Sequence, residues 1–484
     1  MTATDISSEA GLYIAGSWRR GGGPAIPVIN PATEDVIATV PGATPAEVDE
    51  ALAAAQRAQR DWGRAPGGVR GTLVRAIGDV IRANATELAE LQTAEVGKPL
   101  AVSHAEVAMA AQLADYTAGW DRRIEGEILP SDNADEVIHL NRVPIGVVAA
   151  VTAWNAPVAL LVRKIAPALV AGNAVVVKPS ELAPLSSIAL VRMIAEAVDL
   201  PPGLLNLVTG GPETGLALVA SPRTGLVTLT GHRDTGKKVM AAAAANLTRV
   251  SLELGGKAPA IVWADADLDT AVPAVAMARH FNGGQVCTSA ERVFVHESVF
   301  EEFVARYTAL VGHFRVGDPL GEVELGPLAG EAQRNKSINA IERAKAEGAR
   351  VVLGGGPPAG DAFERGFWVT PTVLVDVEPG MDIMREEVFG PVTPIAKVPT
   401  LERAFELANE TRYGLSAYLY TADHRIAMRA ERDLDFGELY INRSIGEQAQ
   451  GHHSGHRESG LGGEDGKHGV LRYTQLRSVY HNYA

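Results

Sequence analysis

Short apolar runs alternate with helix-length stretches along most of this 484-residue chain, and no other feature constrains its fold as strongly. The runs 174–177, 205–208 and 226–229, for example, are each separated from the next by enough residues for a helix. This rhythm is typical of βαβ units, in which crossover helices join parallel strands. The sequence therefore predicts an α/β protein with largely parallel sheets, one of them a nucleotide-binding sheet.

The length of the chain predicts more than one lobe, because a single ordinary hydrophobic core does not grow to this size. A second α/β series begins at 260–263, directly after two consecutive glycines. We therefore expect a domain boundary after residue 256. No internal repeat or low-complexity block interrupts either series.

Composition excludes several kinds of partner. A formal net charge of −14 with no basic run argues against nucleic acid and anionic membranes. The uncharged stretch 143–162 has the length of a membrane span, but Pro144, Gly146 and Pro157 fit a buried strand, a turn and a helix start better. The polar, acidic start lacks a signal-peptide pattern, and the single cysteine fits a reducing compartment, so we expect a cytoplasmic protein.

That cysteine, Cys287, lies in the glycine-bearing segment 281–292, between a helix-like run and a strand-like one. A thiol is the most nucleophilic side chain near neutral pH when it is held as thiolate in a polar, partly exposed site. A lone cysteine is more often a small buried hydrophobe. The segments around it decide between these two interpretations.

Six segments occur in a fixed order along the chain, and together they closely resemble the aldehyde dehydrogenase superfamily. The resemblance extends from residue 30 almost to the C-terminus. Within the superfamily, the stretches 450–455 and 466–469 are most similar to the lactaldehyde and glycolaldehyde dehydrogenase branch. The six segments are 152–157, 177–181, 229–231 with Gly236, 252–257, Cys287 and 386–391.

The resemblance implies a Rossmann-like NAD-binding domain at 1–123 and 145–256 and an α/β catalytic domain at 257–463. It also implies a small β oligomerisation arm at 124–144 and 464–484, in which the strand-like runs 136–142 and 470–480 belong. A homodimer or homotetramer would follow from such an arm.

The resemblance also assigns catalytic roles. Cys287 would attack the aldehyde, Asn155 and the Cys287 amide would stabilise the oxyanion, and Glu253 would activate water for hydrolysis of the thioester. Glu464 matches a carboxylate that relays protons in some members. From the residues alone, Asn155 is equally a helix cap and Glu253 equally an exposed strand-edge residue.

The cofactor expected from the resemblance is NAD, with NADP as the alternative. Lys178 and Glu181 would bind the adenosine ribose, where a carboxylate favours the free 2′-hydroxyl of NAD. Gly231 and Gly236 would bring helix N-terminal amides to the pyrophosphate, although His232 replaces the usual serine. The complete predicted set of cofactor-binding residues is Trp154, Lys178, Ser180, Glu181, Gly231, His232, Gly236, Leu254, Gly255, Glu387 and Phe389.

Substrate choice depends on the entrance, where Arg163, Glu447 and His453 would make a polar lining for a small hydroxylated aldehyde such as lactaldehyde, glycolaldehyde or a sugar-derived aldehyde. Alternatives are a semialdehyde dehydrogenase with Arg163 as anchor for an anionic tail, and an aromatic or aliphatic aldehyde dehydrogenase with these residues on a solvated rim. A CoA-acylating enzyme would not need Glu253. No metal is expected, because the 12 histidines show no convincing ligand spacing.

Overall fold

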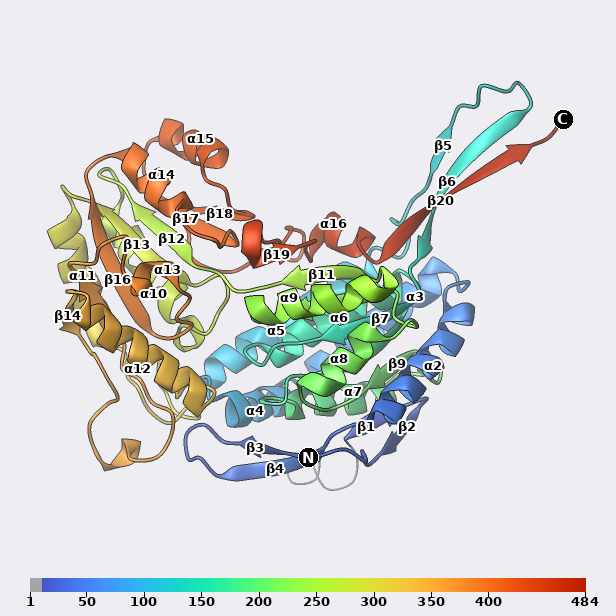
Figure 1. The fold of residues 1–484 in the computed structure, drawn as a ribbon, viewed down its shortest axis with the longest axis horizontal. Coiled ribbons are helices and arrows are strands. Elements are labelled where there is room, and N and C mark those ends of the chain that lie inside the picture. Colours follow the sequence, from blue (N-terminus) through green and yellow to red (C-terminus); the bar gives the residue numbers. More distant parts are fainter. Residues whose placement is uncertain (1–10) are drawn as a thin grey trace.

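The computed structural model describes residues 11–484, so residues 1–10 of the predicted first domain lie outside the described part. Its largest sheet has eight strands in the order β19-β11-β10-β7-β8-β9-β1-β2 (Figure 1). The five central strands run parallel, as the sequence predicts for an α/β protein: β7 (Val147–Val151), β8 (Ala174–Lys178), β9 (Leu205–Leu207), β10 (Leu226–Thr230) and β11 (Arg249–Glu253).

The order of these strands reverses beside β7. Strands β8 and β9 extend from one side of β7, whereas β10 and β11 lie on its other side. In open α/β sheets such a reversal opens a crevice at the carboxyl ends of the strands, and ligands bind there. The connecting helices are α6 (Pro157–Val170), α7 (Leu185–Ala197), α8 (Pro212–Ala220) and α9 (Arg233–Ala243).

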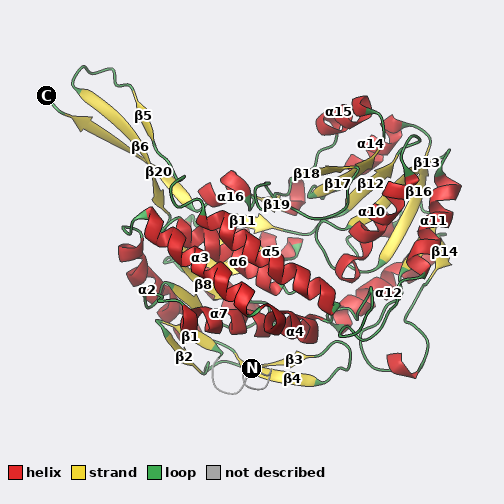
Figure 2. Cartoon of the chain, turned by 180° about the vertical axis from the view of Figure 1, so that it is seen from behind, coloured by secondary structure: helices red, strands yellow, loops and turns green. Residues whose placement is uncertain are grey.

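Helices cover both faces of this sheet. Figure 1 shows α8 and α9 in front, and Figure 2, from behind, shows α3 and α5 over α6. The N-terminal helices are α2 (Pro45–Trp62), α3 (Gly67–Ala83), α4 (Ala85–Val96) and α5 (Leu100–Ala118). The preceding strands are β1 (Leu12–Ile14), β2 (Ser17–Arg19), β3 (Ala25–Ile29) and β4 (Val36–Pro41).

A second sheet has seven strands in the order β14-β15-β16-β13-β12-β17-β18, with only the β14–β15 pair antiparallel. They are β12 (Ala258–Val262), β13 (Ala290–His296), β14 (Arg350–Leu353), β15 (Thr372–Val375), β16 (Val392–Val398), β17 (Ser416–Tyr420) and β18 (Glu438–Ile441). Its helices are α10 (Leu268–His280), α11 (Phe300–Gly312), α12 (Glu331–Ala346), α13 (Asp382–Arg385), α14 (Leu401–Asn409) and α15 (His424–Asp433).

A three-stranded arm projects from the body (Figures 1 and 2). It consists of β5 (Glu127–Leu129), β6 (Glu136–Pro144) and β20 (Thr474–Asn482), and β20 runs antiparallel along the whole of β6. The expectation of a strand over 470–480 is wrong at its start, because Val470 lies in helix α16 (Gly466–Leu471). Val470 is buried there against the first lobe, which explains its apolar character.

The chain crosses between the two sheets twice, once after β11 and once when β19 (Gly460–Leu461) pairs antiparallel with β11. The second crossing places residues 452–465 beside the carboxyl end of β11. No helix between residues 11 and 484 combines the length and apolar character needed to cross a membrane.

Candidate active site

A cavity of about 220 Å³ lies at the carboxyl ends of β7, β10 and β11. It collects residues from five of the six predicted segments, three of which lie at the carboxyl ends of parallel strands, since such strands present these ends at one edge. Of the predicted residues, it is lined by Trp154, Asn155, Gly231, His232, Glu253, Leu254, Gly255, Cys287, Glu387 and Phe389. Lys178, Ser180, Glu181, Gly236, Glu464, Arg163, Glu447 and His453 do not line it.

Asn155 lies between β7 and α6, and its amide points across the cavity to the cysteine segment. Its Nδ2 donates to the carbonyl of Gln285 at 3.0 Å, two residues before Cys287. The alternative that Asn155 caps its own helix is wrong. The N-cap position of α6 is occupied by Ala156, whose side chain makes no capping hydrogen bond. The Glu106 carboxylate instead accepts hydrogen bonds from the amides of Val158 and Ala159, both at 3.1 Å.

Glu106 belongs to a buried pair that sequence reasoning missed. Lys98 donates to Glu106 and, at 3.0 Å, to the backbone carbonyl of Asn155. The side chain of Asn282 donates to the same carbonyl at 3.1 Å. Three side chains thus fix the backbone around Asn155. The spacing of Lys98 and Glu106 gives no signal of this role, because each side chain binds a backbone segment that is distant in sequence.

Cys287 follows a tight turn in which Asn282, Gly283 and Gly284 all have positive φ. Such a conformation favours glycine, and a Cβ at Gly284 would also lie only 2.6 Å from the carbonyl oxygen of Gly390. The turn presents the thiol to the cavity with part of its surface exposed. Burial raises the pKa of Cys287 above its usual value, although the charge of His453 acts in the opposite direction.

Glu253 is the last residue of β11, and only 2% of its surface is exposed. The alternative of an exposed strand-edge residue is therefore wrong. Neither of its carboxylate oxygens has a hydrogen-bond partner among the described residues. Burial, assisted by the charge of Glu464, raises the pKa of Glu253 to about 8, although His453 at 3.7 Å acts in the opposite direction. A carboxyl group with this pKa exchanges protons near neutrality.

The loop after β10 leads into α9 through Gly231 and His232. The His232 ring caps the helix, because its Nδ1 accepts a hydrogen bond from the Asp234 amide at 3.2 Å. Gly236 serves packing, since a Cβ there would lie 2.6 Å from Leu254. This close approach brings α9 against the strand end, and it accounts for the second glycine of the motif.

Lys178, Ser180 and Glu181 lie at the carboxyl end of β8, the next strand of the sheet. The Lys178 Nζ is buried and donates to the carbonyl of Pro179 at 3.0 Å and to Glu181 at 3.4 Å. The Ser180 hydroxyl accepts from the Leu182 amide at 3.3 Å. Burial lowers the pKa of Lys178, and the charge of Glu181 partly offsets it.

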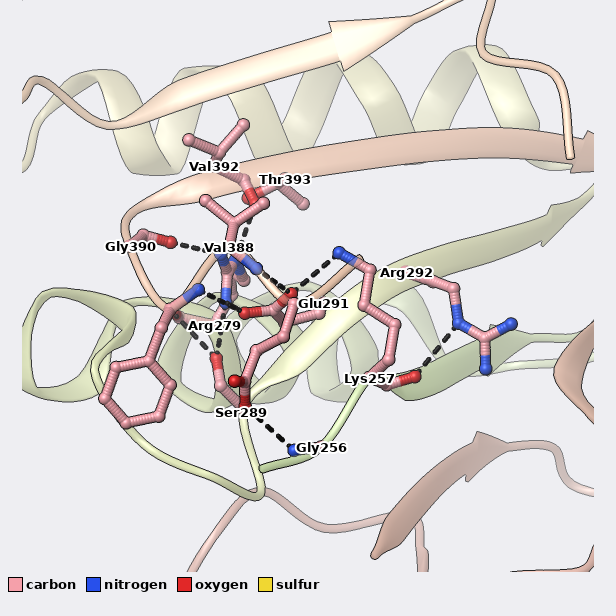
Figure 3. Close-up of polar contacts among 12 residues, drawn as sticks. Gly256, Lys257, Arg279, Ser289, Glu291, Arg292, Val388, Gly390, Val392 and Thr393 are labelled. Carbon is pink, nitrogen blue, oxygen red and sulfur yellow. Dashed lines mark hydrogen bonds and ion pairs between the residues drawn. The ribbon is translucent and has the colours of Figure 1, made fainter. Parts of the chain in front are cut away.

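Glu387 and Phe389 are held by a buried ionic cluster centred on Glu291, which sequence reasoning missed. Figure 3 shows Lys257 and Arg279 meeting at Glu291 from opposite sides. The Glu291 carboxylate also accepts from the amides of Val388 at 2.8 Å and Phe389 at 2.7 Å. The sign of this cluster in the sequence is an acidic side chain, that of Glu291, at the start of the apolar strand β13.

The loop held by Glu291 is strained at Phe389, whose φ is +60°. The Phe389 ring meets Trp154 edge-on at 5.6 Å. Glu387 accepts from the amide of Gly256 at 2.8 Å, and burial together with the charge of Glu291 raises the pKa of Glu387 to about 7. The loop therefore closes one wall of the cavity with a carboxyl group and an aromatic ring.

Arg163, Glu447 and His453 lie close enough to Cys287 for their charges to act on its pKa. Arg163 and Glu447 line a second hollow of about 380 Å³ next to α5, and Glu447 and His453 line a third of about 330 Å³. The alternative that these residues form a water-exposed rim is wrong, because the side chains of Arg163 and His453 are only 8% and 3% exposed. Arg163 pairs with Asp465 at 2.9 Å.

The predicted relay residue Glu464 is buried and bonded to Lys164 and to the Thr228 hydroxyl, so its carboxylate turns toward the sheet. Among residues 11–484, the ligand atoms of Glu438, Glu447 and His453 lie within 4.8 Å of one another, a donor set able to hold a metal ion. The sequence predicts Glu447 and His453 in one polar lining but gives no sign that Glu438 joins them.

The sequence model described as "Aldehyde dehydrogenase family" matches residues 18–479. The chain is 44% identical over 482 residues to a 3,6-anhydro-alpha-L-galactose dehydrogenase of Streptomyces coelicolor, covering 99% of this chain and 98% of that protein. It is 43% identical over 475 residues to the lactaldehyde dehydrogenase of Escherichia coli, covering 97% and 98%. A solved structure of 3,6-anhydro-L-galactose dehydrogenase superposes with a TM-score of 0.96 at 40% identity, covering 98% of this chain and all of that one.

Proposed function

This chain belongs to the aldehyde dehydrogenase family, and on that premise we propose that it oxidises a small hydroxylated aldehyde to the carboxylate by a thioester route. The family consists of oxidoreductases that act on aldehydes with NAD or NADP. One observation supports the proposal above all others, namely that Cys287, Asn155 and Glu253 line the same cavity. The substrate class and the role of each residue are inferences from that arrangement.

In this mechanism the Cys287 sulfur attacks the aldehyde carbon. The resulting oxyanion accepts hydrogen bonds from the Cys287 amide and from Asn155. The Asn155 amide has two N–H donors, and because Gln285 takes one, the other remains for the oxyanion. Such a donor is worth roughly 3–4 kcal/mol in the transition state.

Glu253 completes the reaction by removing a proton from water, which attacks the thioester and releases the carboxylate and the thiol. A carboxyl group that lacks any hydrogen-bond donor suits this role, because it must bind a proton in the course of the step. Because transfer of the acyl group to CoA would not need such a base, the presence of Glu253 favours hydrolysis of the thioester over transfer to CoA. Glu464, which is engaged with Lys164, would act on Glu253 through its charge.

The residues of the crevice fit a nicotinamide dinucleotide, which supplies a hydride acceptor when bound. The N-terminus of α9 beside Gly231 suits pyrophosphate, and Glu387 suits ribose hydroxyls. Trp154, Leu254 and Phe389 offer apolar surface. A Cβ at Gly255 would lie 2.5 Å from the Glu387 carboxylate, so the backbone here is as close as glycine allows.

At the adenosine end, we propose that Lys178, Ser180 and Glu181 bind the second ribose. Glu181 favours the free 2′-hydroxyl of NAD, since a 2′-phosphate would place like charges together. The Lys178 ammonium, only 3.4 Å from Glu181, reduces this effect. We therefore expect NAD to be preferred and NADP to be accepted.

For the substrate, we propose that hydroxyl groups bind to Glu447 and His453 near the thiol. The two relatives described above are named for lactaldehyde and for an anhydrosugar, both of which carry hydroxyl groups. The semialdehyde alternative would need the charge of Arg163, but Asp465 already neutralises that guanidinium at 2.9 Å. The structure therefore supports a hydroxylated substrate over an anionic one.

We also propose a cytoplasmic homodimer or homotetramer. The arm exposes Ile128, Leu476 and Tyr480, each with more than half of its surface open. Apolar residues in such a projecting sheet are suited to burial against a second copy.

The proposal is tested by measuring formation of reduced cofactor, with NAD and with NADP, on a panel of aldehydes. The panel contains lactaldehyde, glycolaldehyde, a sugar aldehyde, succinic semialdehyde, and apolar aliphatic and aromatic aldehydes. We expect the largest kcat/KM for the hydroxylated members. A preference for succinic semialdehyde or for apolar aldehydes would refute the substrate assignment, and turnover by Cys287→Ala would refute the nucleophile.

A further inference from the structure

The amide side chain of Asn282 lies where the two lobes meet, and it has no part in the proposed mechanism. Asn282 belongs to the turn Phe281–Gly284, shortly before the nucleophile, and only 4% of its surface is exposed. Its φ is +52°, in the left-handed region that asparagine tolerates better than most residues. The residue type therefore suits both the backbone of this turn and the position of a buried amide.

The Nδ2 atom of Asn282 is shared between two backbone carbonyls. It donates to the carbonyl of Asn155 at 3.1 Å and, more weakly, to the carbonyl of Gln285 at 3.5 Å. The first carbonyl belongs to the segment that follows β7 in the eight-stranded sheet, and the second to the segment of the nucleophile. One amide group thus links the two segments that would stabilise the oxyanion.

The side chain of Asn155 joins the same two segments. Its Nδ2 donates to the Gln285 carbonyl at 3.0 Å, so the two asparagines and Gln285 form a closed ring of hydrogen bonds. Gln285 is fixed in turn, because its Nε2 donates to the Asn282 carbonyl at 3.1 Å and its Oε1 accepts from the Ala329 amide at 2.9 Å. Both the backbone and the side chain of Asn155 are therefore held against the cysteine segment.

The Asn155 carbonyl has a second donor, Lys98, at 3.0 Å. A carbonyl oxygen has two lone pairs, and Asn282 and Lys98 together use both. Lys98 precedes α5 in the first lobe, whereas Asn282 follows α10 in the second. Loss of the Asn282 side chain would therefore leave this carbonyl with a partner and remove only its tie to the cysteine segment.

We propose that Asn282 is a positioning residue that holds the Asn155 amide at the oxyanion of the reacting aldehyde. The proposal rests on the proposed function, to which the oxyanion role of Asn155 belongs. Asn282 is not among the residues that line the cavity, so it acts through Asn155. A shift of a reacting group by about 1 Å can slow a reaction about 100-fold, so a loosened Asn155 would be a poor donor.

The test compares two reactions of one sulfur, since Cys287 is the only cysteine. p-Nitrophenyl acetate acylates the thiol through a tetrahedral oxyanion, whereas iodoacetamide alkylates it by displacement of iodide and forms no oxyanion. Both rates are measured without aldehyde or cofactor, and Cys287→Ala gives the background. In Asn282→Gly we expect the acylation burst to be about 30-fold slower or more. Alkylation should change less than about threefold, because it depends on the thiolate alone.

A second variant separates the amide from the backbone of the turn. Asn282→Ala also lacks the amide, but it does not add the backbone freedom of glycine. We expect acylation to slow to the same extent in both variants. Slowing in the glycine variant alone would overturn the proposal, since flexibility of the turn would then explain it. If one variant does not fold, unchanged acylation in the other, with the melting temperature of the wild type, would overturn the proposal as well.

Asn442→Gly is the matched control. Asn442 has the same φ of +52°, and its side chain donates to the backbone carbonyl of Thr421 at 2.8 Å. It lines neither the cavity at Cys287 nor the two hollows at Glu447. We expect both rates of this variant to equal those of the wild type. Equal slowing of acylation in Asn442→Gly and Asn282→Gly would overturn the proposal, because loss of any turn asparagine would then suffice.

A double-mutant cycle tests whether Asn282 acts through Asn155. Asn155→Ala should slow acylation about 100-fold or more, because it removes an oxyanion donor. Adding Asn282→Gly to this variant should slow the reaction no further. Additive effects would overturn the proposal, because Asn282 would then act independently of Asn155.

The same measurements separate a failure of this inference from a failure of the proposed function. If Asn155→Ala is acylated as fast as the wild type, the oxyanion role of Asn155 is refuted, and the inference falls with it. If Asn155→Ala is slow while both Asn282 variants react like the wild type, only the positioning role of Asn282 is refuted.

Discussion

The proposed general base has a distinctive pH dependence. Burial and the charge of Glu464 raise the pKa of Glu253 to about 8. The carboxylate form is then about 1% of the total at pH 6, about 9% at pH 7, about 50% at pH 8 and about 91% at pH 9. If Glu253 activates water, the hydrolysis of the acyl-enzyme should rise about 50-fold from pH 6 to pH 8 and less than about twofold from pH 8 to pH 9.

This step can be isolated with an activated ester such as p-nitrophenyl acetate. The ester acylates Cys287 with a burst of nitrophenol, and the steady rate that follows reports hydrolysis without hydride transfer. A carboxyl group with its usual pKa of about 4.5 would give a rate that is flat above pH 6, so a flat profile would refute the reasoning.

Two variants separate the base from its surroundings. Glu253→Gln should lower the steady rate about 100-fold or more and abolish the rise with pH, while the burst remains. Glu464→Gln removes a charge that raises the pKa of Glu253, so its profile should shift to lower pH with the shape unchanged. A shift to higher pH would show that Glu464 acts otherwise than through its charge.

Two further predictions concern the cofactor crevice. Glu291→Ala leaves Lys257 and Arg279 buried without their carboxylate. In denaturant titrations we expect a loss of about 3–5 kcal/mol in the free energy of unfolding, and in kinetics a higher KM for NAD. The control Glu331→Ala, on the surface of α12, should change neither quantity. Glu181→Gln should raise the ratio of kcat/KM for NADP to that for NAD about tenfold or more, because it removes a negative charge from the proposed 2′ position; an unchanged ratio would place Glu181 away from the ribose.

The fold was predictable because apolar runs at helix-length spacing admit few architectures other than parallel α/β sheets. The meeting of Asn155, Glu253 and Cys287 also follows from the sequence in part. Asn155 and Glu253 each stand at or just past the carboxyl end of a predicted strand, and parallel strands bring such positions to one edge. The family resemblance implies that the thiol joins them from the second sheet, but no spacing within the sequence predicts this.

The residues that hold the site were not predictable, because their partners are distant in sequence. Glu106 caps a helix 52 residues away, and Glu291 binds amides 97 residues away. A local pattern carries no signal for such contacts. Gly236 shows the converse case, since its motif suggested phosphate binding while its close contact with Leu254 gives it a packing role.

The distribution of charge explains why Glu253, among several buried carboxylates, is suited to be the base. Asp465 has Arg163, Glu464 has Lys164, and Glu438 has the His453 ring and two hydroxyl groups. Despite the burial of these carboxylates, their partners lower the pKa of Glu464 and of Glu438, and Arg163 limits the rise in the pKa of Asp465, which burial raises to about 6. Glu253 has no such bonded partner, so its ionised form is costly and its pKa rises into the range where it can accept a proton from water and release it again. The bonded partners of Glu438, Glu464 and Asp465, and the lack of a hydrogen-bond partner at Glu253, therefore favour Glu253 as the base.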